Sequence, residues 1–138
     1  MRNIFINAIL IIFLTTFFTK QSYSQSKNGI VGAFIEYEDF ATSTAEDVPC
    51  EFFKAAFAQT IKRVDIKDSL EFKQVVSYAS KFKIAKSKPI DVRVLFTFCY
   101  KKKKVEYCMD RWGLFVNKST GKYYSNKLLA TFLQKKCQ

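Results

Sequence analysis

The sequence contains no histidine, and this absence excludes several kinds of catalytic and metal chemistry at once. A Ser-His-Asp triad, a Cys-His pair, histidine-ligated zinc and the most common general base all require that residue. Glycine is also scarce, and its four positions match neither the Walker pattern nor the dinucleotide-binding pattern. The four cysteines lack the close pairs that are typical of zinc sites. We therefore predict no catalytic residue, no cofactor and no metal site.

Carboxylates are the acid–base groups that remain. Glu36, Glu38 and Asp39 cluster at the end of the first expected strand. A glycosidase needs two carboxyl groups at a defined separation across a cleft, one of them with a raised pKa. A carboxylate-dependent hydrolase is therefore an alternative function, and it requires these acids to converge in a pocket.

The chain has one long apolar run, which lies at its start. The run Ile4–Phe18 follows Arg2 and precedes the small residues around Ser24, which is the pattern of a cleavable secretory signal. It is shorter than the roughly 20 residues that span a bilayer. We predict a signal peptide over residues 1–24 and one secreted or periplasmic domain over residues 25–138, which is not an integral membrane protein.

All four cysteines follow the predicted signal and would reach a compartment in which disulfides form. A hairpin centred on residues 103–104 would place Cys99 opposite Cys108, at a distance that a disulfide can bridge. Cys50 would then pair with Cys137. These two bonds are our expectation, and unpaired buried thiols are the alternative.

We predict strands at residues 30–37, from their β-branched and aromatic content, at 90–100, from alternating apolar residues, and at 105–117 and 123–124, which follow as antiparallel return strands. The second of these is the clearest. Its apolar side chains at every other position from Ile90 to Phe98 would share one face of a sheet. Turn-forming residues separate the last three segments, so they are expected to pair antiparallel.

Helical patterns account for the remaining segments. Residues 68–84 fit either a helix or a strand, and the capping pattern Asp68-Ser-Leu-Glu71 favours the helix. A last helix is expected after Ser125, which would cap it. A helix that begins near Asp47 would bury a stripe of five residues, Cys50, Phe53, Phe57, Ile61 and Val64. We predict an α+β fold: an antiparallel sheet of three to five strands, two or three helices packed on one face, and one or two disulfides.

A few residues resemble the cystatin protease inhibitors. Gln74-Val75-Val76-Ser77 is similar to the first inhibitory loop of that family, and Trp112-Gly113 is similar to the second. The chain departs from the family pattern in three ways: Tyr78 replaces the loop glycine, no proline precedes Trp112, and a terminal helix is added. The match covers only these residues, so we assign no function from it.

Charge is distributed unevenly along the chain. Residues 25–51 carry six acids and one base, whereas residues 52–138 carry twenty bases and six acids. The longest basic run, Lys101, Lys102, Lys103 and Lys104, lies between two tyrosines whose rings are available for stacking. A basic polyanion-binding protein that acts through this hairpin is an alternative function. Ordinary solvation of a hairpin tip is the structural explanation of the same run.

Trp112 is the single tryptophan of the chain. In the hairpin register expected above, Trp112 lies opposite Leu95, and both would join Leu114 in an apolar strip on the sheet face away from the helices. Such a strip is either covered by the chain or available to a partner, and tryptophan is enriched among residues that carry interface energy. The leading hypothesis is a non-catalytic binding module that acts on a protein partner as an inhibitor or accessory factor.

Overall fold

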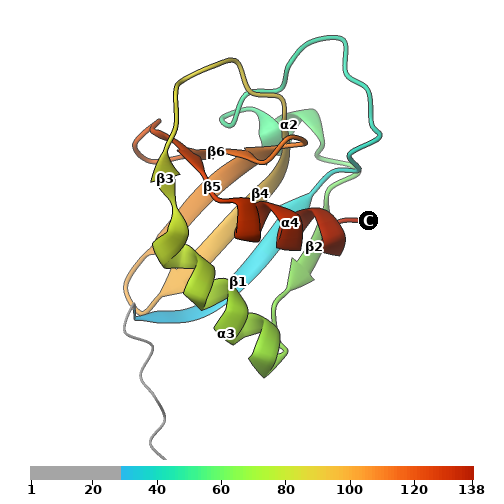
Figure 1. Cartoon of the computed structure of the whole chain (residues 1–138). Coiled ribbons are helices and arrows are strands. Elements are labelled where there is room, and N and C mark those ends of the chain that lie inside the picture. The colour runs from blue at the N-terminus through green and yellow to red at the C-terminus, as the bar shows by residue number, and fades with distance from the viewer. Residues whose placement is uncertain (1–28) are drawn as a thin grey trace, which may run out of the picture.

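The computed structural model describes residues 29–138, which form a seven-stranded antiparallel sheet with three α-helices and one short 3-10 helix (Figure 1). The predicted signal peptide lies outside the described residues. In the order in which they cross the sheet, the strands are β2 (Lys62–Asp65), β1 (Ile30–Tyr37), β4 (Val92–Tyr100), β5 (Lys104–Asp110), β6 (Leu114–Asn117), β7 (Tyr123–Ser125) and β3 (Lys83–Ile84). The helices are α2 (Phe53–Ala56), α3 (Ser69–Tyr78), the 3-10 helix η1 (Ala79–Lys81) and α4 (Lys127–Lys136).

One hydrophobic core lies between the sheet and helices α3 and α4, which cross the front of the sheet in Figure 1. Strand β4 contributes Phe96 and Phe98, whose rings meet edge to face with centroids 4.6 Å apart. Val75 of α3 and Leu129 and Leu133 of α4 are fully buried against them. This burial explains why two ten-residue helices are stable here, because most helical stability in proteins comes from such packing.

A second core lies on the opposite face of the sheet, under a segment that contains α2. Leu95 of β4 points into it, between the first-core residues on either side, as alternation along a strand requires. A bulge between Val92 and Val94 also turns Val92 into this second core. Phe53 of α2 covers the face and meets the Phe57 ring at 5.6 Å. Strand β4 is thus buried on both faces.

These observations correct the predicted fold class. The sheet has seven strands rather than three to five, and the helices do not all pack on one face. Two extra strands, β2 and β3, are short sheet edges with mostly exposed residues, so they show no apolar alternation. A third additional strand is present because a turn at residues 111–113 divides the predicted strand 105–117 into β5 and β6.

The helix predicted from Asp47 is reduced to the four residues of α2. The chain turns at Thr60, whose backbone N–H donates to the carbonyl of Phe57 at 3.0 Å, and Val64 lies in strand β2 instead.

The helix predicted over residues 68–84 is confirmed for residues 69–78. Asp68 caps it and accepts hydrogen bonds from the N–H groups of Leu70 and Glu71, both at 2.9 Å.

The last helix is also present, but its cap is Asn126 rather than Ser125. The Asn126 side-chain oxygen accepts from the N–H of Leu129 at 3.1 Å. Its side-chain nitrogen donates to the carbonyl of Tyr78 at 2.8 Å, which ties the end of α3 to the start of α4. None of the helices described in residues 29–138 has the length and apolar character to cross a bilayer.

A single disulfide, Cys50–Cys108, is present in the described residues, with a Cα–Cα distance of 5.7 Å. The predicted pairing was therefore wrong, and Cys99 and Cys137 are free thiols. The cause is the hairpin register. Cys99 lies opposite Lys104, and Cys108 lies opposite Leu95 in the second core, where the segment around Cys50 packs. Burial raises the pKa of the Cys137 thiol to about 12.

A buried arginine fastens the loop between β1 and α2 to the sheet. The Arg93 side chain is fully buried, and Nη1 donates to Oδ1 of Asp91 at 2.6 Å. Nη2 donates to the carbonyl of Thr42 at 3.1 Å and to Oγ1 of Thr44 at 3.0 Å. Asp91 in turn accepts from the backbone N–H of Val48 at 3.1 Å. The loop is therefore held by charged groups with several hydrogen bonds each.

Candidate functional site

The three acids at the end of β1 do not converge in a pocket. The Glu36 carboxylate pairs with Lys54, whose Nζ lies 2.8 Å from Oε2. Glu38 is buried and accepts hydrogen bonds from the hydroxyls of Thr42, at 2.9 Å, and Thr60. Asp39 accepts from a backbone N–H two residues further on at 2.8 Å, which closes a local turn. Each carboxylate thus has a structural partner of its own.

The pKa of Glu38 is shifted in the direction opposite to that of a general acid. Burial raises this pKa, but hydrogen bonds from Thr60, Thr42 and the backbone of Asp39 outweigh the burial, and the net pKa is below its ordinary value of 4.5. A general acid of a glycosidase needs a raised pKa. The geometry therefore gives the carboxylate-dependent hydrolase no support, and we do not propose it.

The lowered pKa of Glu38 predicts a pH-dependent contribution to stability. A depressed folded-state pKa stabilises the protein above the unfolded-state pKa, and this contribution is lost as the pH falls through the folded-state value. We expect Glu38→Gln to lower the free energy of unfolding at neutral pH and to lower it much less near pH 3. Urea unfolding at both pH values measures the difference. Glu46→Gln, at an exposed position, is the control. An equal loss for Glu38→Gln at both pH values would contradict the assignment.

Trp112 lies on a rigid turn and its side chain projects into solvent. The residue is 80% exposed. The buried carboxylate of Asp110 accepts from the backbone N–H groups of Trp112 and Leu114, both at 2.9 Å. Gly113 has a φ of +84°, and a Cβ built there would lie 2.8 Å from that of Ala130 in α4, so only glycine fits. The turn is thus fixed from both sides while the indole ring remains outside.

The predicted apolar strip is not an exposed surface. Leu95 is 1% exposed and Leu114 is 9% exposed, and both belong to the second core. The true register pairs Leu95 with Cys108, four residues before Trp112. The structure therefore brings Leu95 and Leu114 together in the interior and leaves Trp112 alone at the surface.

The lysine run forms the tip of the β4–β5 hairpin, as predicted. The N–H of Tyr100 donates to the carbonyl of Lys103 at 2.8 Å, which closes the turn, and all four lysines of residues 101–104 are exposed. The tyrosine rings are less available than expected. Tyr107 is stacked on Phe82, with centroids 4.4 Å apart, and its ring also meets that of Tyr124 at 6.1 Å.

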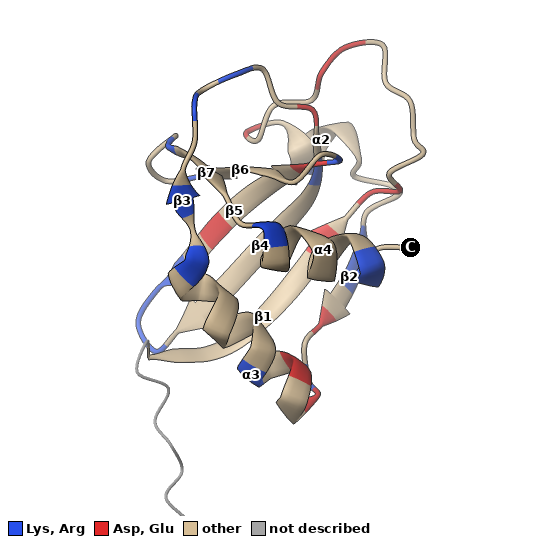
Figure 2. Cartoon of the chain, in the orientation of Figure 1, with Lys and Arg blue, Asp and Glu red and all other residues tan. Residues whose placement is uncertain are grey.

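Two segments of the chain that contain no acid lie side by side. Residues 72–90 contain five lysines, residues 111–138 contain five lysines and one arginine, and neither contains Asp or Glu. They meet where β3 pairs with β7. In Figure 2, basic residues follow one edge of the molecule from the β4–β5 hairpin past η1 and β3 to the loop that follows. We call this the basic edge; its lysines are Lys81, Lys83, Lys86, Lys88, Lys101, Lys102, Lys103, Lys104, Lys122 and Lys127.

The lysines of the basic edge are exposed, and none has an acid within 4 Å in residues 29–138. Other cations do have partners: Lys118 pairs with Glu106 at 3.0 Å, and Lys136 pairs with Glu71 at 2.5 Å. Sequence reasoning identified the hairpin lysines but missed the rest of the edge. The absence of acids from both segments was visible, but their contact depends on the pairing of β3 with β7, for which the two-residue β3 gave no signal.

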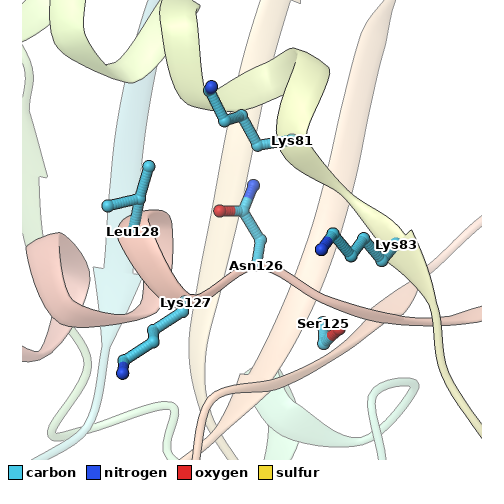
Figure 3. Close-up of a pocket in the computed structure, with 6 residues that line it drawn as sticks. All are labelled: Lys81, Lys83, Ser125, Asn126, Lys127 and Leu128. Carbon is cyan, nitrogen blue, oxygen red and sulfur yellow. The ribbon is translucent and has the colours of Figure 1, made fainter.

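A cleft of about 300 Å³ lies within the basic edge, between η1 and β3 on one side and the connection from β7 to α4 on the other (Figure 3). Six residues line it: Lys81, Lys83, Ser125, Asn126, Lys127 and Leu128. This cleft could not be predicted from the sequence, because its two walls are more than forty residues apart along the chain.

The cystatin-like residues do not form an inhibitory edge. Gln74-Val75-Val76-Ser77 lies within helix α3, and Val75 is fully buried in the first core. Comparisons with protein-family models, curated proteins and solved structures find no match to this chain. Function must therefore be argued from these surfaces alone.

Proposed function

We propose that this chain is an exported, non-catalytic binding module whose basic edge binds a negatively charged polymer. The observation that carries the proposal is the contact between two acid-free segments. These segments supply six exposed lysines and the hairpin tip supplies four more, and none of the ten has an acid within 4 Å among the described residues. The Cys50–Cys108 disulfide supports export, because such bonds persist mainly in oxidising compartments outside the cytosol.

The arrangement of charge favours a polymer over a folded acidic protein. The lysines are distributed along an edge from the hairpin tip to the loop after β3, so an extended polyanion would follow the whole row (Figure 2). Each neutralised phosphate or sulfate group releases condensed counterions, which supplies affinity that falls as salt rises. Four lysines at a hairpin tip are too few for strong binding at physiological salt, whereas roughly six to ten contacts are enough to give a steep dependence on salt.

Heparin retention at increasing salt tests this function. We expect wild-type binding to fall steeply with salt, and replacement of Lys101, Lys102 and Lys103 by Gln to reduce the slope of log K against log salt by roughly two to three. Replacement of Lys62, Lys67 and Lys135 by Gln removes the same charge from exposed positions outside the basic edge and is the matched control. Binding that does not depend on salt, or equal losses in both triple variants, would overturn the proposal.

A second candidate function, binding to a protein partner, is favoured by the Trp112 turn. An 80% exposed indole ring on a turn fixed by Asp110 and Gly113 needs little ordering when it enters a pocket. Arg111, the adjacent residue, is also of a type enriched at interface hot spots. Its guanidinium donates to the carbonyl of Thr42 at 3.4 Å, which helps to hold the turn against the loop after β1, and it lies 3.4 Å from Asp91.

The single tryptophan makes the second candidate directly measurable. Fluorescence of the free protein should show a solvent-exposed indole, and a docked protein partner from the host envelope should shift the emission to the blue. Crosslinking to that partner should be lost in Trp112→Ala and retained in Phe52→Ala, which removes another exposed aromatic ring. An unchanged spectrum together with equal crosslinking of both variants would exclude the Trp112 turn as the interface.

A further inference from the structure

The floor of the cleft in the basic edge is fixed by hydrogen bonds, and lysines stand around it. The side chain of Asn126 donates to the Tyr78 carbonyl at 2.8 Å and accepts from the Leu129 N–H at 3.1 Å, so both of its polar ends are already bound. The α3–η1 segment and the start of α4 are therefore held at a fixed separation. The hydroxyl of Ser125 and the half-exposed side chain of Leu128 line the remainder. The separation of these two elements, which we call the frame of the cleft, thus does not depend on the lysines around it.

Three unpaired cations surround this frame. Lys81, Lys83 and Lys127 each line the cleft, and no acid lies within 4 Å of any of them in residues 29–138. Figure 3 shows the ammonium group of Lys83 directed toward Asn126, whereas those of Lys81 and Lys127 point away from the cleft. Like charges repel, so three ammonium groups without a counter-ion are expected to separate. Each lysine has a flexible four-carbon stem, which allows its ammonium group to turn inward when an anion is present.

The chemistry of the cleft selects the kind of anion. Lysine ammonium groups donate in several directions around a point charge, which suits a compact tetrahedral oxyanion with several acceptor oxygens. The exposed part of Leu128 offers an apolar contact to the carbon skeleton that carries the anion. A volume of about 300 Å³ is at the lower end of ligand pockets and accommodates one small charged unit rather than a long polymer.

We propose that this cleft binds one phosphate or sulfate ester group, with Lys81, Lys83 and Lys127 as its donors. The proposal rests on the polyanion-binding function and names the unit of the polymer that is held in place. The rest of the basic edge would attract the polymer through long-range charge, and the cleft would fix its register.

NMR titration of the ¹⁵N-labelled folded protein with inorganic phosphate and inorganic sulfate, at constant ionic strength against chloride, tests the site itself. We expect saturable shifts at the amides of Ser125, Lys127 and Leu128. The double variant Lys83→Gln and Lys127→Gln should weaken binding at least tenfold. The control is Lys88→Gln with Lys122→Gln, which removes the same charge from the basic edge outside the cleft. Shifts no larger than those with chloride, or equal weakening in both variants, would overturn the proposal.

A second arm separates the site from the function on which it rests. A sulfated heparin disaccharide should compete with inorganic phosphate for the same amides, which would support an ester group as the ligand. If wild-type protein retains long heparin in a salt-dependent way but shows no phosphate or sulfate shifts, the polymer-binding function stands and the cleft is not its site. If the cleft binds inorganic phosphate but neither the disaccharide nor heparin, the polymer is wrong and the oxyanion site stands.

Discussion

Replacement of Cys108 by serine is expected to lower the free energy of unfolding by about 4 kcal/mol. The Cys50–Cys108 bond joins residues 58 positions apart, and the entropy that a crosslink removes from the unfolded chain grows with the length of the loop that it closes. The effect is large for a domain of this size, whose total stability is of the order of 5 to 15 kcal/mol. Chemical denaturation of the oxidised wild type and the variant measures it.

Cys99→Ser is the matched control for this prediction. Cys99 is a partly exposed free thiol, so its loss should change stability little. Peptide mapping without reduction should recover residues 50 and 108 in one linked fragment, with residues 99 and 137 unlinked. A linked fragment that contains residues 99 and 108, together with a large loss of stability in Cys99→Ser, would restore the pairing expected from the sequence and contradict the structure.

Arg93→Met is expected to lower the free energy of unfolding by about 3 kcal/mol. Removal of one partner of a buried ion pair typically costs about 3 to 5 kcal/mol, because the remaining polar groups lose their bonds without regaining water. Here the carbonyl of Thr42 and the hydroxyl of Thr44 lose their Arg93 donor. The loss lies at the lower end of the range because Asp91 still faces Arg111 at 3.4 Å.

The control for this variant is Arg63→Met. Arg63 is half exposed and pairs with Asp65 at 2.9 Å on the surface of β2, and exposed pairs of this kind contribute at most about 1 kcal/mol. Urea unfolding compares the two variants, and hydrogen exchange locates the effect. Faster exchange should be concentrated in residues 39–48, which Arg93 holds to the sheet. Equal stability of the two variants would show that the Arg93 cluster does not fasten this loop.

Elements with a strong local signal could be predicted from the sequence. Strand β1 has the predicted limits because its β-branched and aromatic residues form one continuous run. The choice of a helix for residues 69–78 depended on Asp68, which is indeed its cap. The hairpin tip at residues 101–104 was also recognised, because charged residues there separate two apolar segments.

The register of that hairpin could not be predicted, and the errors in the disulfide pairing and in the apolar strip around Trp112 follow from it. Four identical lysines give no indication of which two lie at the turn, and the actual pairing of Cys99 with Lys104 differs from the expected pairing with Cys108. In the actual register, Cys108 forms the disulfide with Cys50, and Trp112 lies in the turn after β5. Asp110 and Gly113 lie on either side of Trp112, and these two residue types are a turn signal. The apolar residues before and after them favoured one continuous strand, so the break between β5 and β6 was not predicted.

The burial of β4 on both faces was a second source of error. Its sequence contains Leu95 and Thr97 between the first-core residues, and a nearly continuous apolar strand is typical of burial on both sides. Reading only one alternating face predicted helices on that side alone. The candidate site was even less accessible to prediction, since the cleft exists only because β3 and β7 become neighbours.

The composition of the two outer strands has a consequence for how copies of this chain meet one another. Strands β2 and β3 end the sheet with unpaired backbone groups, and such groups can recruit a further strand from another molecule. β3 begins with Lys83 and belongs to a segment without any acid. When two copies approach through the β3 rim, cations face cations, so fibre-like growth by strand addition is disfavoured there. Copies bound at high local concentration along the anionic polymer that we propose as the ligand would thereby remain dispersed.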